Sequence, residues 1–169
     1  IGAAMILHGG QNLNDTWRWD GLAWTQPAVA APPPPRTWHA MTTDYVRGRV
    51  VLFGGAAAGW VPLADTWEWD GVAWTNVTPS TGSPPARSRH ALAWDPVKQR
   101  VVLFGGGASS GSVYRDDTWE WDGVSWQQAL PQPARVLPPA RFEHALSWDG
   151  ERVLITPHTA GYGPHLDER

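Results

Sequence analysis

Histidines recur at one position of this sequence, and imidazole is the side chain that most readily binds metals or transfers protons near neutral pH. His39, His90 and His144 each stand three residues after an arginine. Three copies at even spacing could converge on a metal ion. Because metal ligands are usually set asymmetrically, with partners hydrogen-bonded behind them, we instead expect three packed, hydrogen-bonded histidines and no metal site.

Carboxylates are the second group that could do chemistry, as a general acid and a general base. Asp20, Asp70 and Asp122 each precede a glycine, and Glu68 and Glu120 stand two residues before the last two of them. Glycoside hydrolysis needs two carboxylates that flank one bond, and nothing in the spacing selects such a pair. A turn explains each Asp, and a strand position facing solvent or a neighbouring repeat explains each Glu. We therefore expect no catalytic residue and no enzyme activity.

The composition excludes further classes of function. The chain has no cysteine, which rules out disulfides, thiolate metal sites and cysteine nucleophiles. A net charge of -3, from 13 basic and 16 acidic residues, gives no electrostatic basis for binding nucleic acid. The apolar segment 50–64 is too short and too rich in glycine for a transmembrane helix. We expect no cofactor, and only His158 and His165 with Asp167 leave a further metal arrangement open.

The elements that must position these residues come from a repeat. The phrase Asp-Thr-Trp-x-Trp-Asp-Gly occurs at 15–21, 65–71 and 117–123. A period of about 50 residues is the signature of a repeat architecture. Apolar runs that end in paired glycines precede two of the phrases, at 50–55 and 101–106, and such runs are typical of strands covered on both faces. A motif present in every repeat builds the repeat, so function should lie in what differs between copies.

Each phrase predicts a hairpin, because Asp-Gly is the strongest short hairpin signal. A two-residue type I′ turn at Asp70-Gly71 places Trp67 opposite Trp74. The same register pairs Trp17 with Trp24, and Trp119 with Trp126. With the histidine segment and the apolar run, each repeat gains four short antiparallel strands, and a proline-rich crossover leads to the next repeat. This pattern predicts an all-β fold of propeller blades.

The order of these segments resembles the Kelch repeat, in a form that we associate with bacterial proteins. The order is arginine-x-x-histidine, an apolar run with two glycines, the tryptophan phrase and one more tryptophan, and it covers nearly the whole chain. The resemblance implies a four-stranded propeller blade per repeat and an interaction platform more often than an enzyme. The many Ala, Pro, Gly and Arg residues favour a bacterial source, and we expect an extracellular, periplasmic or cell-surface location rather than a cytoplasmic one.

We expect one Kelch-like propeller domain or fragment over residues 1–169. Its repeats span approximately 1–35, 36–86, 87–140 and 141–169, the first and the last being partial. This amounts to about three repeats plus one extra strand. Because propellers normally close with more blades, we expect part of a larger propeller. A homodimer in which two chains close a six-bladed ring is the alternative.

Variation between repeats points to a binding face. The links between the second and third strands, at 56–64 and 107–116, differ in sequence and lie on the same face as the crossovers. Trp60, Tyr114 and Arg115 are unrepeated residues of types enriched in binding hot spots. We predict a non-catalytic protein-binding or assembly scaffold that uses them. One alternative is a carbohydrate-binding or carbohydrate-processing propeller with stacking aromatic residues, and another is that these side chains fold back onto their own repeat.

Overall fold

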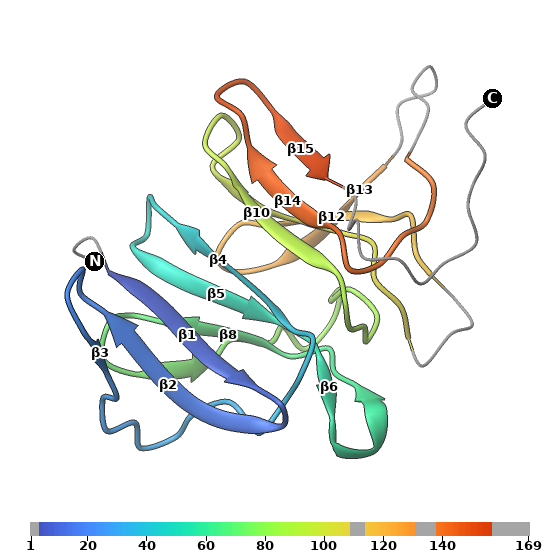
Figure 1. Ribbon diagram of the computed structural model, residues 1–169. Coiled ribbons are helices and arrows are strands. Elements are labelled where there is room, and N and C mark those ends of the chain that lie inside the picture. Colours follow the sequence, from blue (N-terminus) through green and yellow to red (C-terminus); the bar gives the residue numbers. More distant parts are fainter. Residues whose placement is uncertain (1–3, 109–113, 131–137, 157–169) are drawn as a thin grey trace.

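The structure, a computed structural model, describes residues 4–108, 114–130 and 138–156. In these ranges the chain forms short antiparallel strands and one 3₁₀ turn, η1 (Ala58–Trp60). The strands build several small sheets that stand side by side like the blades of a propeller (Figure 1). The all-β prediction is confirmed. No helix in the described ranges is long and apolar enough to cross a membrane.

The sheets follow one another along the chain. The first contains β1 (Met5–Gly10), β2 (Leu13–Trp19) and β3 (Trp24–Thr25). The second contains β4 (Ala40–Asp44), β5 (Arg49–Phe53), β8 (Thr66–Trp69) and β9 (Trp74–Asn76). The third contains β10 (Ala91–Asp95), β11 (Arg100–Phe104), β12 (Thr118–Trp121) and β13 (Trp126–Ala129). The fourth contains β14 (Ala145–Trp148) and β15 (Val153–Thr156), and a small ribbon pairs β6 (Ala56–Ala57) with β7 (Val61–Pro62).

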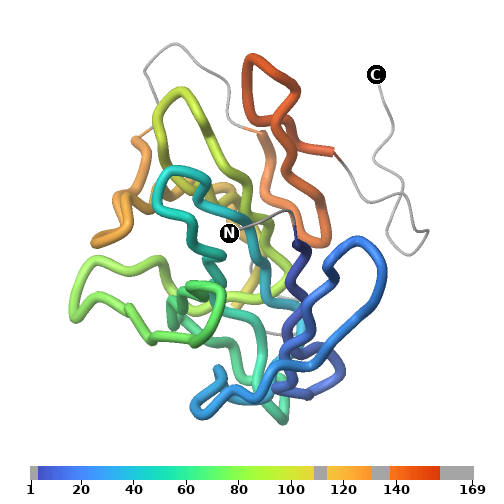
Figure 2. The backbone as a smooth tube through the Cα atoms, turned by 90° about the vertical axis from the view of Figure 1, so that its left-hand side faces the viewer, coloured from blue at the N-terminus to red at the C-terminus, as the bar shows by residue number. Residues whose placement is uncertain are grey.

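The first strands of successive repeats, β4, β10 and β14, are neighbours in space. Figure 2 shows that the turns of the hairpins β4–β5, β10–β11 and β14–β15 all lie at one end of the molecule. The link between the second and third strands of each repeat therefore lies at the opposite end, where the crossovers also enter the first strands. This arrangement concentrates the variable segments at one end.

The apolar run of each complete repeat is covered on both faces, as the sequence predicted. In β5, Val50 and Leu52 pack with Trp69 and Trp74 in one buried cluster, against which the partly buried Ile6 of the first sheet packs. The alternate residues of β5 belong to a second buried cluster with residues of the third sheet, among them Leu92, Trp94, Leu103 and Trp126. Because side chains alternate across a strand, one strand contributes to both interfaces between sheets.

The paired glycines permit a close approach of the backbone. Gly55 has φ +99°, and a Cβ atom there would lie 2.7 Å from the carbonyl oxygen of Thr37. Gly106 has φ +82°, and its Cβ atom would lie 2.7 Å from the carbonyl oxygen of Ser88. The glycines therefore let the end of the second strand pack against the segment that enters the first strand of the same repeat.

The tryptophan hairpins form, but the predicted register is wrong. Trp69 lies opposite Trp74, where the sequence predicted Trp67 opposite Trp74. The other two hairpins shift in the same way, with Trp19 opposite Trp24 and Trp121 opposite Trp126. In the second sheet the turn has four residues, because one oxygen of Asp70 accepts hydrogen bonds from the N–H groups of Val72 and Ala73, both at 2.8 Å. An aspartate that binds the backbone two residues ahead builds this longer turn.

Aspartates of this kind are structural throughout the described residues. Each accepts hydrogen bonds from the N–H groups two and three residues ahead, at distances from 2.7 to 3.1 Å. They are Asp20, Asp44, Asp70, Asp95, Asp122 and Asp149. These backbone hydrogen bonds hold the pKa of Asp20 and Asp149 below its usual range. The carboxylates before glycine are therefore part of the turns, as the sequence indicated.

Hydrogen bonds donated by tryptophan N–H groups connect neighbouring sheets. The indole of Trp74 donates to the hydroxyl of Thr16 at 3.0 Å, and the indole of Trp126 donates to the hydroxyl of Thr66 at 2.9 Å. The indole of Trp121 donates to the carboxylate of Glu68 at 3.0 Å. These bonds repeat from one interface to the next, so the repeated phrase builds the contacts between sheets.

One of these bonds is absent between the first and second sheets. The indole N–H of Trp69 corresponds to that of Trp121, but it is buried without a hydrogen-bond partner among the described residues. Arg18 occupies the position that corresponds to Glu68, and a guanidinium has no acceptor to offer. The first interface therefore contains an unsatisfied buried donor, which costs stability.

Arg18→Gln supplies an acceptor at this position without burying a new charge. We expect it to raise the free energy of unfolding by about 1 kcal/mol and the Tm by roughly 3 °C. Thermal unfolding followed by circular dichroism measures both. Arg18→Met is the matched control, because it has a similar length and no acceptor. Equal Tm values for the two variants would show that the unpaired N–H group of Trp69 does not reduce the stability of this interface.

Candidate binding surface

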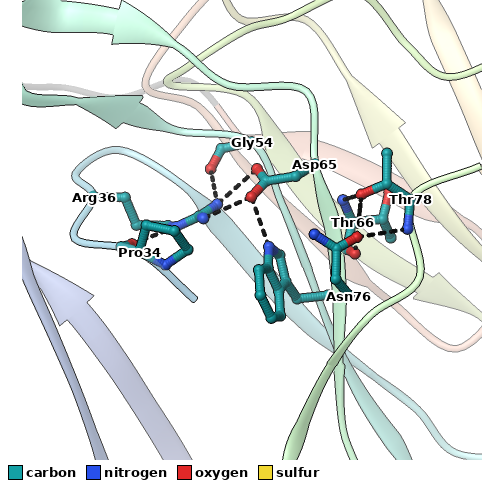
Figure 3. A network of polar contacts seen from close by, with 8 residues as sticks. Pro34, Arg36, Gly54, Asp65, Thr66, Asn76 and Thr78 are labelled. Atoms are coloured by element: carbon teal, nitrogen blue, oxygen red, sulfur yellow. Dashed lines mark hydrogen bonds and ion pairs between the residues drawn. The ribbon is translucent and has the colours of Figure 1, made fainter. Parts of the chain in front are cut away.

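A buried arginine anchors the start of the second repeat (Figure 3). The side chain of Arg36 is completely buried and forms two parallel bonds to Asp65, at 2.8 Å and 2.7 Å. It also donates to the carbonyl oxygens of Gly54 and Pro34, both at 3.0 Å. The indole N–H of Trp67 adds a bond of 2.6 Å to the same carboxylate. One guanidinium thus connects the crossover, the glycine pair and the third strand.

The third repeat contains the same arrangement. Arg87 is completely buried, binds Asp117 at 2.6 Å and 2.8 Å, and donates to the carbonyl oxygens of Gly105 and Pro85. Burial alone would raise the pKa of Asp117, but hydrogen bonds from Arg87 and Trp119 lower it overall. The carboxylate therefore stays ionised, and charge-assisted bidentate bonds of this kind are among the strongest in proteins.

The same arginines also join each repeat to the one before it, through their backbone. The N–H group of Gly10 donates to the carbonyl oxygen of Arg36 at 3.1 Å. The N–H group of Gly55 donates to the carbonyl oxygen of Arg87 at 3.0 Å, and the N–H group of Gly106 donates to the carbonyl oxygen of Arg141 at 2.9 Å. The position of each arginine therefore fixes the segment between it and the following histidine.

Three residues of these segments share a backbone conformation that is uncommon for residues other than glycine. Trp38, Arg89 and Glu143 each stand just before the histidine and have φ values of 53°, 59° and 52°. The N–H group of Arg89 donates to the carbonyl oxygen of Trp38, and the N–H group of Glu143 donates to that of Arg89, both at 2.9 Å. Left-handed residues of this kind cluster at functional sites. Side chains from three repeats are thereby placed next to one another.

These side chains form a continuous stack that we call the aromatic–arginine row. It contains Trp60, Trp38, Arg89, Phe142 and Tyr114. The outer pairs are parallel: Trp60 lies 4.6 Å from Trp38, and Tyr114 lies 4.2 Å from Phe142, between ring centroids. The guanidinium of Arg89 lies between them, 3.9 Å above the Trp38 ring and 5.9 Å from the Phe142 ring. Cation–π contacts at these distances orient the guanidinium.

Two of the three binding residues chosen from the sequence belong to this row. Trp60 is 57% exposed and Tyr114 is 37% exposed, although each stacks on a residue of its own repeat or the next. Arg115 lies apart from the row. Its backbone N–H group donates to Gly106, and its side-chain Nε atom is buried without a partner among the described residues.

The sequence reasoning missed Trp38, Arg89, Phe142 and Glu143. A signal was present, because the two positions between arginine and histidine read Thr-Trp, Ser-Arg and Phe-Glu in the three repeats, while the residues on either side are constant. Variation inside a fixed motif marks positions that the fold does not dictate. Glu143 lies beside the row, with one oxygen 3.2 Å from Nη1 of Arg89.

A shallow hollow of about 390 Å³ adjoins Trp60 at the end of the row. Its lining comes from the β1–β2 turn, from Thr37 and from the β6–β7 hairpin. Gln11 and Asn12 contribute the side-chain amides, and no charged residue lines the hollow. The surface therefore combines a charged aromatic row with a neutral depression.

Of the histidines that the structure describes, His8, His90 and His144 are buried and His39 is partly buried. The other metal arrangement that the sequence left open, His158 and His165 with Asp167, lies outside the described residues. Among the described residues no group of three or more potential ligands could hold a metal ion. His90 lies edge-on against Phe53 and His144 against Phe104, across the interfaces between sheets. Their ring nitrogens make no well-formed hydrogen bond among the described residues, although the backbone of Phe53 and of Phe104 lies close enough to offset part of the lowering of the pKa of His90 and of His144, which burial causes. They are packing residues.

The first interface contains two histidines where the others contain one. His8 stands at the position of Phe53 and lies 6.1 Å from the ring of His39, edge to face. Burial, with the nearby charge of Arg36, lowers the pKa of His8 to about 4. Burial, with His8 and Arg36, lowers the pKa of His39 to about 4 as well. Both imidazoles are therefore neutral in the folded protein near pH 7.

These lowered pKa values make the fold sensitive to mild acid. A histidine whose pKa is lower in the folded than in the unfolded chain stabilises fully above the unfolded value and loses that contribution as pH falls toward the folded value. We expect the protonation of His8 and of His39 each to lower the free energy of unfolding by about 2 kcal/mol between pH 7 and pH 5. Urea unfolding at the two pH values measures the loss.

His8→Phe restores the Phe–His pair of the other interfaces and serves as the comparison. The loss of unfolding free energy between pH 7 and pH 5 should shrink by about the contribution of one histidine. An equal loss in His8→Phe and in the unmodified chain would contradict the assignment of this sensitivity to the first interface.

Comparisons with known proteins agree with this architecture. Residues 1–165 match the family model described as the KLHDC2/KLHL20/DRC7 Kelch-repeats domain. The chain is 33% identical over 174 residues to Adagio-like protein 3 of Oryza sativa subsp. japonica, with 91% of this chain and 27% of that protein covered. It is 30% identical over 176 residues to Adagio protein 3 of Arabidopsis thaliana, covering 91% of this chain and 28% of that protein. The chain thus spans little more than a quarter of these relatives.

The comparisons correct two expectations from the sequence. A further relative, 32% identical over 123 residues, is dynein regulatory complex subunit 7 of Chlamydomonas reinhardtii; 66% of this chain and 10% of that protein are covered. Plant and algal relatives contradict the bacterial source, which rested on composition and on the form of the repeated phrase. The same relatives, among them a subunit of a dynein regulatory complex, contradict the extracellular, periplasmic or cell-surface expectation. The family match covers nearly the whole chain, and the chain belongs to the Kelch-repeat family.

Proposed function

We propose that this chain is a non-catalytic protein-binding or assembly module that holds its partner on the aromatic–arginine row. The row lies at the end of the molecule where the strand-2/strand-3 links and the crossovers meet. The single observation that carries the proposal is the continuous stack from Trp60 through Arg89 to Tyr114, which is built from side chains of three repeats.

The composition of the row supports this proposal. Trp, Tyr and Arg are the residue types enriched in binding hot spots. Because each ring stacks on a neighbour and the guanidinium lies between two rings, little side-chain entropy remains to be lost on binding. The backbone conformation of Trp38 and Arg89 adds rigidity, since the buried arginine that precedes each of them fixes the segment. Rigid aromatic surfaces of this kind bind without rearrangement.

The remaining charged groups support a non-catalytic role. The aspartates of the hairpin turns are engaged by backbone N–H groups, and Asp65 and Asp117 neutralise the buried arginines. Lys98 binds Glu120 at 2.6 Å, and Arg47 and Trp121 both contact Glu68. Each of these charges therefore has a structural partner, and Glu143, the carboxylate beside the row, pairs with Arg89.

The relatives support assembly as the form of binding. One of them is named as a subunit of a dynein regulatory complex, so a domain of this kind occurs in a protein that works inside a larger assembly. We also propose that residues 1–169 form Kelch-like repeats divided near residues 35, 86 and 140, and that they belong to a larger propeller. A homodimer that closes one ring is the alternative assembly.

A carbohydrate-binding function is the second candidate, and the hollow beside Trp60 favours it. An exposed indole face with the neutral amides of Gln11 and Asn12 is the lining that suits a neutral polyhydroxylated ligand. The row itself favours the protein partner, because it contains a cation and extends well beyond the hollow.

Arg89→Gln and Trp60→Ala should each weaken binding of a protein partner at least tenfold, because they remove the centre and one end of the row. A partner captured by the unmodified chain is purified, and its Kd is measured by calorimetry with each variant. Val72→Ser and Val124→Ser are the controls. Both residues are exposed in hairpin turns outside the row, and their Kd should stay within twofold.

Equal Kd values for Arg89→Gln, Trp60→Ala and the control variants would contradict the proposed surface. Binding to a glycan array that disappears in both Trp60→Ala and Tyr114→Ala, without any protein partner, would favour the carbohydrate function instead.

A further inference from the structure

Four hairpin turns place a valine at the same exposed position. In each turn an aspartate accepts the N–H group of the residue two positions ahead, at 2.8 to 3.1 Å, and that residue is a valine. The four valines are between 61% and 79% exposed, and they are Val46, Val72, Val97 and Val124. The corresponding residues of the first and fourth sheets are Leu22 and Glu151. Because turn positions ordinarily favour Gly, Asn, Asp or Ser, the turns themselves do not explain the valines.

The four turns lie together at the end of the molecule opposite the aromatic–arginine row. β4 and β8 both pair antiparallel with β5, so the two hairpin turns of the second sheet lie at the same end of it, and the third sheet is built in the same way. Arg49 joins the two turns of the second sheet through an ion pair of 3.2 Å with Asp70. A Cβ atom at Gly123 would collide with the guanidinium of Arg47, so this close contact joins the second sheet to the third.

A tyrosine adds to this apolar end. Tyr45 precedes Val46, is 74% exposed and lies edge to face against Trp94, with ring centroids 6.5 Å apart. We call Tyr45 and the four valines the turn surface. It exposes about 400 Å² of apolar side-chain area, with about 30 Å² for each aliphatic carbon and about 200 Å² for a whole tyrosine. An exposed apolar area of this size commonly marks an interaction site.

The size of the turn surface matches what a stable dimer needs. An interface of standard size buries about 800 Å² on each partner, of which roughly 57% is apolar. Each copy must therefore supply about 450 Å² of apolar surface. The turn surface supplies nearly all of this area without any rearrangement of the backbone.

The charges around the valines favour a second copy over a charged partner. Four ion pairs connect basic residues at these turns with carboxylates of the same sheet: Arg47–Asp44, Arg47–Glu68, Arg49–Asp70 and Lys98–Glu120. Both signs are thus present and paired. A two-fold interface brings a patch against itself, so a patch of one sign would repel its own copy. The turn surface avoids this repulsion, and it offers no excess of one charge to an anionic lipid or a strongly charged protein.

We propose that the turn surface joins two copies of this chain into a two-fold dimer. The valines of one copy are buried against the turn surface of the other, and the two aromatic–arginine rows point away from each other. The dimer goes beyond binding at the row and does not depend on it, because the row lies at the other end of the chain. One dimer presents two equivalent rows, and such bivalence strengthens binding to a partner that carries two sites.

Sedimentation velocity over a concentration series tests the dimer. We expect the unmodified chain to associate reversibly, with a Kd in the micromolar range or tighter. Val46→Lys combined with Val124→Lys should weaken association at least tenfold, because like charges then meet where apolar area is lost. Val72→Ser combined with Val97→Ser should weaken it at least threefold through lost apolar burial alone. All four side chains are exposed, so the Tm of the monomer should not change.

Two control variants separate this dimer from binding at the row. Val61→Ser changes a valine that is 57% exposed at the other end, and Arg89→Gln removes the centre of the row. Both should dimerise normally, whether or not Arg89→Gln binds a partner. A chain that stays monomeric up to its solubility limit, or a dimer that survives both double variants, would overturn the proposal. Binding to phosphatidylcholine vesicles that the lysine variant abolishes, without any dimer, would assign the turn surface to lipid and overturn the second copy as its occupant.

Discussion

The structure depends on one buried arginine in each complete repeat. Arg36 and Arg87 are both fully buried, and each binds the aspartate just before its own third strand and the carbonyl of the glycine just after its own second strand. Their backbone carbonyls accept the glycine N–H of the preceding repeat. Removing one partner of such a pair leaves an uncompensated buried charge, at a cost of about 3–5 kcal/mol. One residue type therefore joins strands within a repeat and joins repeats to each other.

The candidate binding surface follows from this anchor. Because the arginine is fixed, the second residue after it has a fixed place, where it adopts a left-handed conformation. That position carries Trp38, Arg89 and Glu143 in successive repeats. The constant part of the motif thus supplies rigidity, and the variable part supplies the side chains that a partner can contact. Loop residues such as Trp60 extend the surface by stacking on it.

The sequence predicted the fold well because its signals are local. Apolar runs with two glycines and repeated tryptophans specify strands, turns and packing within a few residues. The hairpin register was missed, because Asp70-Gly71 has the composition of a two-residue turn. Only the hydrogen bonds from backbone N–H groups to the Asp70 carboxylate reveal that the turn has four residues. Part of the aromatic–arginine row could be picked out from the sequence. Trp60 and Tyr114 stand out as unrepeated residues, but Arg89 becomes central only when folding brings Trp38 and Phe142 to either side of it. The bacterial source rested on composition and on the form of the repeated phrase, and neither contains a physical signal for the source or the location.

The central claim is that the buried arginine–aspartate pair holds the candidate binding surface in place, and amide hydrogen exchange in Asp117→Asn tests it most directly. The N–H group of Arg89 donates to Trp38, and the N–H group of Gly55 donates to Arg87. In the variant, exchange of these two amides should accelerate at least tenfold, while the amide of Val102 in the middle of β11 keeps its protection. Unchanged exchange at Arg89 and Gly55 would contradict the account, because the surface would then be rigid without its anchor.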